Sequence, residues 1–581
     1  MNSVLAFLAV IAVILLLCAL IGARNRKEEE AALRSRFIKE FGGIPSKKMS
    51  ALRYEKVPAW YLRHQPEDGI DEITWNDLDL DAVYRRMDST LSGAGEEYLY
   101  ALLRSPVPAR HSGKSGDRGG VSICQIRWLE DDANAMVRLA LQKALARLGH
   151  SGSYSVYEYL DRLEEAPEES NRQHILTFLL PAGSIALLFA SVPAGVVCLI
   201  ASLCYNMVMY YRRRGEIEPY IMTFSYILRM LRCADELCAA ECSAFAGEQK
   251  ELKQLSAGFA KFRRWSGILL SGSAVSSGNP VDIAVDYVRI LFHIDLIKFN
   301  TMLSEAKGLR DEIDGMISIL GRVDASIALA SFERSLPYTC IPVLDKTDEN
   351  PGTGKRKGPT VEGVYHPLLA EPVPNDIDLS GPILLTGSNA SGKSTFLKAL
   401  ALCSLLAQTI GFCPARSYRG TIYRIRSSMA LRDSIQSGES YFMVEIRSLK
   451  RIADLSGDGG RPVLCFIDEV LRGTNTVERI AASTEILTVL AQRGVLCCAA
   501  THDMELSVLL EQLYANYHFE EEIRDGDVVF SYHLHEGRAA SRNAIRLLEA
   551  VGFEEGITAR AQSRAESFER TGEWQTQPLS P

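Results

Sequence analysis

The chain has 581 residues, 47% hydrophobic and 23% charged, so it is long enough for several domains and too apolar to be intrinsically disordered. Asp and Glu number 72 against 64 Lys and Arg, which gives a net charge of −8. A protein that coats nucleic acid non-specifically is usually basic, so this balance argues against that class and leaves room only for a local DNA-binding surface.

The first apolar segment lies at the N-terminus. Nineteen uncharged, mostly apolar residues run from Val4 to Gly22, and as a helix they are long enough to cross the hydrocarbon core of a bilayer. Arg24, Arg26 and Lys27 follow at once, which by the positive-inside rule keeps the rest of the chain inside. A cleaved signal peptide would carry its charge before the apolar core. We therefore predict an uncleaved transmembrane anchor over residues 1–23.

A second apolar segment, of 37 residues, runs from Ile175 to Tyr211 without a charge. This is about twice the length that one membrane span needs. Turn-forming residues near its middle, Ser191 to Gly195, predict a helical hairpin with arms at about 175–190 and 194–211. Three arginines, 212–214, close the segment and place both ends in the cytoplasm. The alternative is a buried core hairpin in a soluble domain.

The thirteen cysteines are scattered, several of them inside apolar runs. This usage is typical of reduced, buried thiols in a cytosolic protein and not of a disulfide framework. Cys238 and Cys242 are close enough to share a metal, but no second Cys or His pair accompanies them.

The rest of the chain divides at a Pro-, Gly- and Lys-rich linker, residues 346–360. Before the linker, apolar residues recur at helical spacing, and after it short β-branched runs alternate with helical stretches. We therefore predict an all-α region followed by an α/β domain with a mostly parallel sheet. The remaining predicted boundaries are a juxtamembrane segment at 24–72, a first helical core at 73–174, a helical lever or clamp at 212–345, the α/β domain at 361–565 and a disordered tail at 566–581.

A phosphate-binding loop opens the α/β domain. The apolar run Ile383–Thr386 leads into G-x-x-x-x-G-K-S, and a helical stretch, Thr395–Gln408, follows, so the motif has the strand–loop–helix context that it requires. Backbone N–H groups of such a loop surround phosphates, Lys393 is placed for the β and γ phosphates, and the Ser394 hydroxyl is placed for Mg²⁺. The predicted nucleotide contacts are Gly387, Ser388, Asn389, Ala390, Ser391, Gly392, Lys393, Ser394 and Thr395.

Two further strand ends carry candidate catalytic groups. A buried-strand run, 463–467, ends in Asp468 and Glu469, which suit Mg²⁺ coordination and polarisation of the attacking water. An acidic pair that merely meets solvent is the alternative, and the phosphate-binding loop about 75 residues upstream disfavours it. A second apolar strand, 495–500, ends at Thr501 and His502, and this histidine can sense the γ phosphate or orient water.

The stretch Ser437–Glu445 (SGESYFMVE) lies between these motifs and, by its residues alone, is either a phosphate contact or a surface turn. Together with the motifs above, it resembles the MutS family of DNA mismatch-repair ATPases. The match is close over about 365–565 and weaker over 73–106 and 216–344. The other segments that carry the resemblance are His366–Leu369, Pro374–Asp376, Asp468–Asn475, Ala500–His502, Arg538–Arg542 and the helical stretch Ala544–Ala561.

The resemblance implies a P-loop ATPase that uses ATP and Mg²⁺ and dimerises through the α/β domain. Ser440 matches the serine that reaches the partner's γ phosphate in trans. Asn389 and His502 match residues near the reacting phosphate and water, and Arg472 matches an interface loop. In the family, ATP turnover switches a clamp of long helices around DNA, so we expect a homodimer that binds mismatched or otherwise structured DNA.

The chain departs from the family in three places. No Phe-x-Glu mismatch wedge occurs in the first 150 residues, and an apolar hairpin interrupts the helical region. Glu371–Pro374 stands where family members often place an aromatic residue against the adenine.

The basic-aromatic stretch Phe259–Trp265 is either a phosphate contact or, more simply, a helix with its aromatic residues inward.

Two functions follow. The first is a multi-pass protein of the inner or plasma membrane whose cytoplasmic ATPase domain opens and closes a helical clamp on DNA. The second is an ATP-driven switch or scaffold at the membrane that binds a protein or lipid partner. An ABC transporter subunit is disfavoured because three spans are too few and no L-S-G-G-Q-type signature is present.

Overall fold

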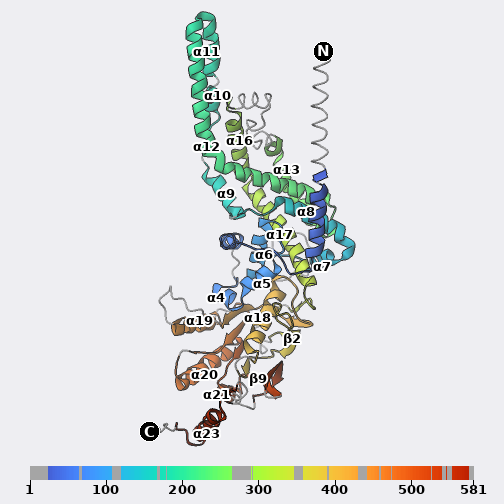
Figure 1. Cartoon of the computed structure of the whole chain (residues 1–581), viewed down its shortest axis with the longest axis vertical. Helices are drawn as coiled ribbons and strands as arrows, with labels where there is room; N and C mark the ends of the chain where they lie inside the picture. Colours follow the sequence, from blue (N-terminus) through green and yellow to red (C-terminus); the bar gives the residue numbers. More distant parts are fainter. Residues whose placement is uncertain are drawn as a thin grey trace.

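The computed structural model has a helical part (residues 24–339) and an α/β part (from residue 340) that follow one another along its long axis (Figure 1). The described residues are 24–25, 27–64, 68–106, 120–152, 154–166, 170–177, 179–264, 290, 292–345, 358–388, 391–429, 441–456, 460–472, 474–524, 527–539, 545, 548 and 552–574. The predicted anchor, residues 1–23, lies outside them.

Two helices form the centre of the helical part. α6 (Gly93–Arg104) is buried along its whole length, and α17 (Arg310–Arg334) packs against it. The contact is close enough that a Cβ at Gly321 would lie 2.7 Å from the carbonyl oxygen of Ala94. The surrounding helices are α2 (Ala51–Tyr54), α3 (Ala59–Arg63), α4 (Glu72–Asp77), α5 (Leu80–Met87), α7 (Ile123–Glu130), α8 (Ala135–Leu148), α9 (Val156–Glu165), α10 (Arg172–Leu176), α13 (Ala246–Ala257) and α16 (Ile294–Gly308).

The second apolar segment is a helical hairpin that projects beyond the helical part (Figure 1). Its arms are α11 (Leu179–Ala190) and α12 (Val192–Ala239), and the chain turns at Ser191, as predicted. The helix does not end at residue 211 as predicted, because α12 is 48 residues long and ends at Ala239. Arginine is a good helix former, so Arg212–Arg214 do not end the helix.

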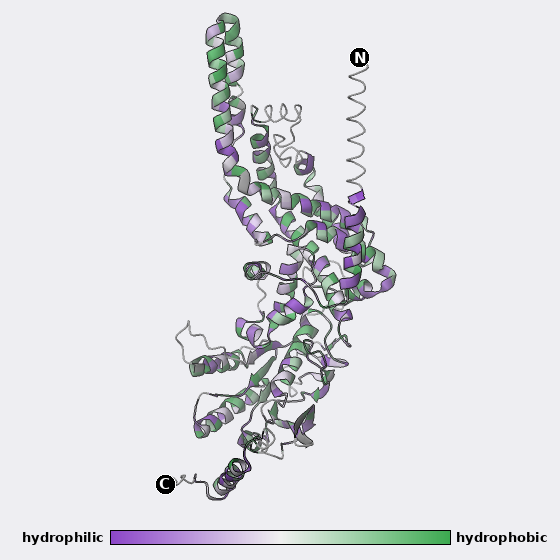
Figure 2. Ribbon diagram, in the orientation of Figure 1, coloured by the Kyte–Doolittle hydropathy of each residue, from purple (hydrophilic) through white to green (hydrophobic). Residues whose placement is uncertain are grey.

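The hairpin packs on itself and not into the core, which contradicts the buried-hairpin alternative. Only 17% of the most apolar window of Val192–Ile217 is buried, whereas 83% of the corresponding window of α17 is. α17 is therefore a core helix despite its composition, and the hairpin is an exposed apolar surface (Figure 2). Its exposed residues include Phe189, Val197, Ile200 and Val208. Insertion of this surface into a bilayer stays a prediction.

The larger sheet of the α/β part has six strands in the order β10-β9-β4-β8-β7-β6. All neighbouring pairs are parallel except β9 and β10, which confirms the predicted mostly parallel sheet. β4, β7 and β8 are wholly buried because helices cover the sheet, as their continuous apolar runs indicated. The strands are β4 (Ile383–Thr386), β6 (Arg424–Ser428), β7 (Val463–Asp468), β8 (Leu496–Ala500), β9 (Ala515–Arg524) and β10 (Asp527–Glu536). The helices are α18 (Lys393–Thr409), α19 (Tyr441–Leu455), α20 (Thr476–Gln492), α21 (Met504–Leu509) and α23 (Glu555–Thr571).

Two predicted boundaries differ from the structure. β1 (Val343–Leu344) precedes the predicted linker but pairs with β5 (Ser417–Gly420), in a small sheet of order β1-β5-β2-β3 with β2 (Thr360–Val364) and β3 (Asn375–Asp378). The α/β part therefore begins before the linker. The predicted disordered tail starts too early, because α23 extends to Thr571.

The basic-aromatic stretch follows its simpler interpretation over its described residues, 259–264. Phe259 and Phe262 are fully buried in the core, and Arg263 forms an ion pair with Asp235. Trp265 lies outside the described residues.

The helical part covers the outer edge of the large sheet through α4. The buried Asp77 carboxylate accepts hydrogen bonds from the Ser427 hydroxyl (2.6 Å) and the Met429 N–H (2.9 Å), both at the end of β6. The Ser427 N–H donates to the Thr74 hydroxyl at 3.2 Å. An exposed sheet edge is a site for unwanted pairing, and this contact closes it.

Asp77→Ala should loosen β6, because it leaves a buried hydroxyl and a buried N–H unpaired at a cost of about 2 kcal/mol. Hydrogen–deuterium exchange in the peptide that contains residues 424–429 should rise by about thirtyfold, since local opening follows local stability. Asn76→Ala, an exposed change on the same helix, is the control. Equal exchange in the two variants would show that the contact does not hold β6.

Candidate nucleotide-binding site

The loop between β4 and α18 has the backbone shape that the glycine pattern indicates. Gly387 has φ 144° and Gly392 has φ 104°, both in the left-handed range that side chains disfavour. A Cβ at Gly392 would also lie 3.1 Å from the Tyr532 ring. The next residue, Lys393, begins α18, so the N-terminus of this helix opens onto the loop. Asn389 and Ala390 lie outside the described residues.

Lys393 lies folded over this loop. Its ammonium group donates to the carbonyl oxygens of Gly387 (2.7 Å) and Ser388 (2.6 Å), and the side chain is buried. Burial lowers the pKa of Lys393 by disfavouring its charged form. Ser391 is also buried, and its hydroxyl has no hydrogen-bond partner. The loop thus holds a cation and a hydroxyl donor, groups that suit an anionic ligand.

The structure brings Ser394 and Asp468, the two residues proposed for Mg²⁺, together. The Ser394 hydroxyl donates to Asp468 Oδ2 at 2.6 Å, although 74 residues separate them. Parallel strands explain the approach: β4 and β7 both flank β8, so their carboxyl ends lie at one edge. A hydroxyl and a carboxylate are the oxygen ligands that Mg²⁺ prefers.

Glu469 and His502 also meet at this edge. His502 Nδ1 lies 3.4 Å from Glu469 Oε1, and Arg472 Nε lies 2.8 Å from Glu469 Oε2. The hydrogen bond to His502 is the largest cause of a lowered pKa for Glu469, and the same contact raises the pKa of His502. The pair is therefore charged between these two shifted pKa values.

This charge pair sets an expected pH dependence. The contribution of His502 to the stability of the folded chain is fully present below its ordinary pKa of 6.5. It is lost as the pH rises through the raised pKa of His502. Glu469→Gln should return the His502 pKa toward its ordinary value. Diethyl pyrocarbonate reacts with neutral imidazole, so its reaction rate at His502, followed against pH by peptide mass spectrometry, measures this shift. Exposed His533 is the control site, and an unchanged His502 profile in the variant would contradict the pair.

A cavity of about 450 Å³ adjoins the loop. Its lining includes Glu371–Val373 and the aromatic residues Phe519 and Tyr532. Asn375 also lines it and contacts β10: its amide donates to the Tyr532 carbonyl oxygen (3.0 Å) and accepts from the Leu534 N–H (2.7 Å). The cavity thus supplies an aromatic ring although Glu371–Pro374 has none.

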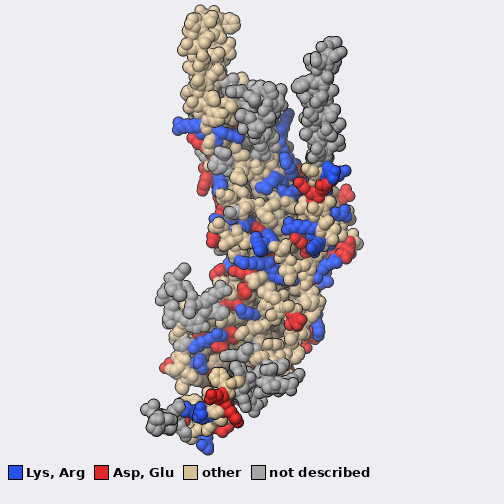
Figure 3. All heavy atoms as spheres, in the orientation of Figure 1, with Lys and Arg blue, Asp and Glu red and all other residues tan. Residues whose placement is uncertain are grey.

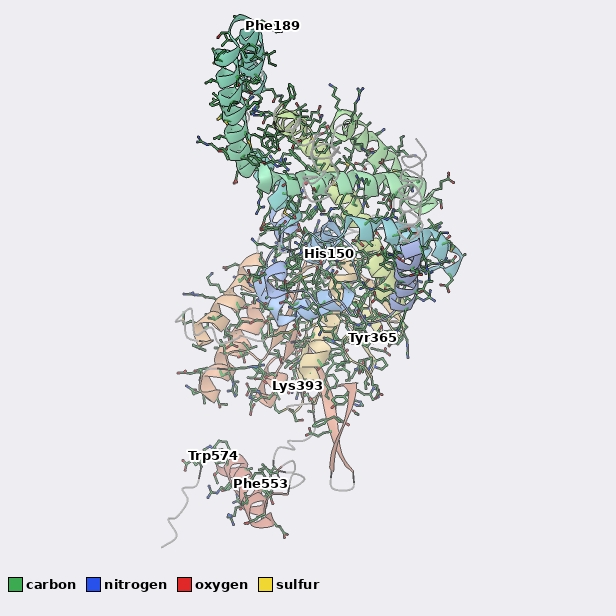
Figure 4. All side chains as sticks on the ribbon, turned by 45° about the horizontal axis from the view of Figure 1, so that its top comes forward. His150, Phe189, Tyr365, Lys393, Phe553 and Trp574 are labelled. Atoms are coloured by element: carbon green, nitrogen blue, oxygen red, sulfur yellow. The ribbon has the colours of Figure 1, made fainter. Side chains whose placement is uncertain are left out.

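Tyr532 and Phe519 were not predicted from the sequence. Tyr532 has φ 55° and lies where the pairing of β9 with β10 shifts register, so its direction depends on a local irregularity. No periodic pattern encodes this position. Of the predicted nucleotide contacts, Thr395 lines the cavity, whereas Ser440 lies outside the described residues. Figure 4 shows Lys393 in the α/β part, far from Phe189 at the tip of the hairpin.

Comparison with known proteins agrees with this geometry. Residues 383–569 match the family model described as MutS domain V. Two curated relatives, each named DNA mismatch repair protein MutS and from the J-10-fl and Y-400-fl strains of Chloroflexus aurantiacus, are 32% identical over 294 residues. The match covers 49% of this chain and 29% of each relative, so it spans less than a third of their length. On the domain V match and these relatives, residues 383–569 are similar to domain V of the MutS family.

Proposed function

We propose that the chain binds and hydrolyses ATP with Mg²⁺ and uses this reaction as a dimeric switch. One observation carries the proposal: Lys393, Ser394, Asp468 and Glu469 converge beside a cavity large enough for a nucleoside. The similarity to domain V of the MutS family, with its mismatch-repair ATPases, supports the same reaction.

The residues fit the proposed ligands. The glycine loop and α18 would surround the phosphates, Lys393 would pair with the β and γ phosphates, and the base would lie in the cavity beside Tyr532. Ser394 and Asp468 would hold Mg²⁺, which neutralises phosphate charge when bound. The present hydrogen bonds of Lys393 to loop carbonyls are exchanged for phosphate contacts in this proposal.

Glu469 is the proposed general base. His502 and Arg472 lower its pKa below the ordinary value of 4.5, so it stays ionised at neutral pH, and it lines the cavity. An ionised carboxylate there can orient a water molecule for in-line attack and accept its proton. His502 keeps Glu469 in place, and Arg472 must release it when the nucleotide enters.

The dimer and DNA are proposals that family resemblance supports. Ser440 would complete the partner's site in trans, and the helical part would act as the clamp. The exposed apolar hairpin favours a second candidate, a membrane switch that binds a protein or lipid. In Figure 3 the outer part of the hairpin lacks charged residues, and basic residues gather at its base. We propose that the hairpin crosses the inner or plasma membrane and that the α/β part is cytoplasmic.

The test uses the full chain in nanodiscs. ATP hydrolysis is measured alone and with perfect duplex, mismatched duplex and branched DNA at low salt, where phosphate contacts are strongest. Stimulation of ATP hydrolysis by one of these DNAs, or ATP-dependent binding of the chain to it, supports the clamp. Hydrolysis without binding to any DNA supports the membrane switch, and the absence of ATP binding contradicts both.

A further inference from the structure

The turn that carries Glu469 is strained. Glu469 has φ 62° and Leu471 has φ 61°, and two residues with side chains in the left-handed region within three positions are costly. Such a conformation persists only where its surroundings hold it. The positions of Glu469 and Arg472 relative to the cavity depend on this turn.

Two hydrogen bonds and apolar packing hold one side of this turn in place. The Glu469 N–H donates to the carbonyl oxygen of Ala500 at 2.9 Å, and the Ser483 hydroxyl donates to the carbonyl oxygen of Val470 at 3.2 Å. Val470 and Leu471 are both buried in the apolar cluster that α19 and α20 share with the sheet. These contacts fix one side of the turn.

Glu445, one turn into α19, holds the other side. Its side chain is only 3% exposed, and its Oε1 accepts a 2.6 Å hydrogen bond from the Leu471 N–H. Oε2 is buried without a hydrogen-bond partner, so the bond from the Leu471 N–H to Oε1 is the one that the described part of the structure gives this carboxylate. Burial raises the pKa of Glu445.

We infer that Glu445 is a positioning residue for the proposed hydrolysis: it holds the 469–472 turn so that Glu469 faces the cavity. The inference rests on the proposed function. α19 begins at Tyr441, directly after Ser440 in the sequence, and carries Glu445, whose carboxylate binds the turn of the proposed base. A displacement of α19 would thus reach Glu469 through the hydrogen bond from Leu471 to Glu445.

Glu445→Met and Glu445→Gln test the inference. Methionine fills a similar volume without an acceptor, whereas glutamine keeps an acceptor for the Leu471 N–H. We expect Glu445→Met to lower kcat by about a hundredfold, since a misplaced catalytic group has effects of this size, with the Kd for a fluorescent ATP analogue within about twofold. Glu445→Gln should keep kcat within about fivefold of the unchanged chain. The ATP-analogue Kd shows that each variant is folded.

A double variant separates positioning from general damage. If Glu445 acts through Glu469, then Glu469→Gln combined with Glu445→Met should be no slower than Glu469→Gln alone. Additive losses, or a Glu445→Met variant with unchanged kcat, would overturn the inference. Failure of the proposed function looks different, because the unchanged chain would then neither bind nor hydrolyse ATP.

Discussion

Lys393→Ala should abolish measurable ATP binding. The ammonium group is buried in the loop, and its exchange of loop carbonyls for phosphate oxygens would form charge-assisted hydrogen bonds. Their loss should weaken ATP binding by at least about a hundredfold, because hydrogen bonds to charged groups contribute about 1.5–3 kcal/mol each. Isothermal titration calorimetry with ATP and Mg²⁺ measures the change.

Lys450→Ala is the matched control for this variant. Lys450 is an exposed lysine on α19 that pairs with Asp454, so its removal takes away the same charge far from the loop. Equal ATP affinity in Lys393→Ala and Lys450→Ala would show that the glycine loop is not the phosphate site.

Glu469→Gln should separate binding from hydrolysis. Glutamine has the shape of the glutamate but accepts no proton, so hydrolysis should fall by about 10²- to 10⁴-fold, the usual contribution of a general base. ATP affinity should change little, and the bound nucleotide should persist. Single-turnover hydrolysis and size-exclusion chromatography with light scattering measure the rate and the amount of ATP-bound dimer.

Glu485→Gln provides the control, because Glu485 is an exposed carboxylate on α20, the helix that follows this turn. It should hydrolyse ATP at the unchanged rate. If Glu469→Gln also hydrolyses ATP at the unchanged rate, another group is the base. The roles proposed for His502 and Arg472 around Glu469 would then be wrong as well.

The sequence predicted the parts of the site whose signals are local. β4, β7 and β8 are continuous apolar runs, and the loop with its helix has fixed spacing, so each could be found without knowledge of the fold. Ser394 and Asp468 were each assigned to Mg²⁺ from a local motif, and the strand order seen in the structure explains why the two side chains meet. The signal for the hairpin turn at Ser191 was also local, because Pro193 and Gly195 follow within four residues.

The parts that were missed depend on contacts between distant segments. β1 joins the α/β part by pairing with β5, some 75 residues downstream, and the Pro- and Gly-rich linker pointed to a later boundary. Tyr532 reaches the cavity through a register shift and through Asn375, which lies 157 residues away. Glu445 ends the Ser437–Glu445 stretch that the sequence singled out, but its role depends on a strained turn that only the structure shows.

The most direct test is a structure of the full-length Glu469→Gln chain with ATP and Mg²⁺, by electron cryomicroscopy in nanodiscs. The account predicts the triphosphate between residues 387–394 and Asp468, the base beside Tyr532, and residue 440 of a second copy at the γ phosphate. Nucleotide bound elsewhere, or a monomer with the 437–445 segment turned away from any second copy, would contradict it.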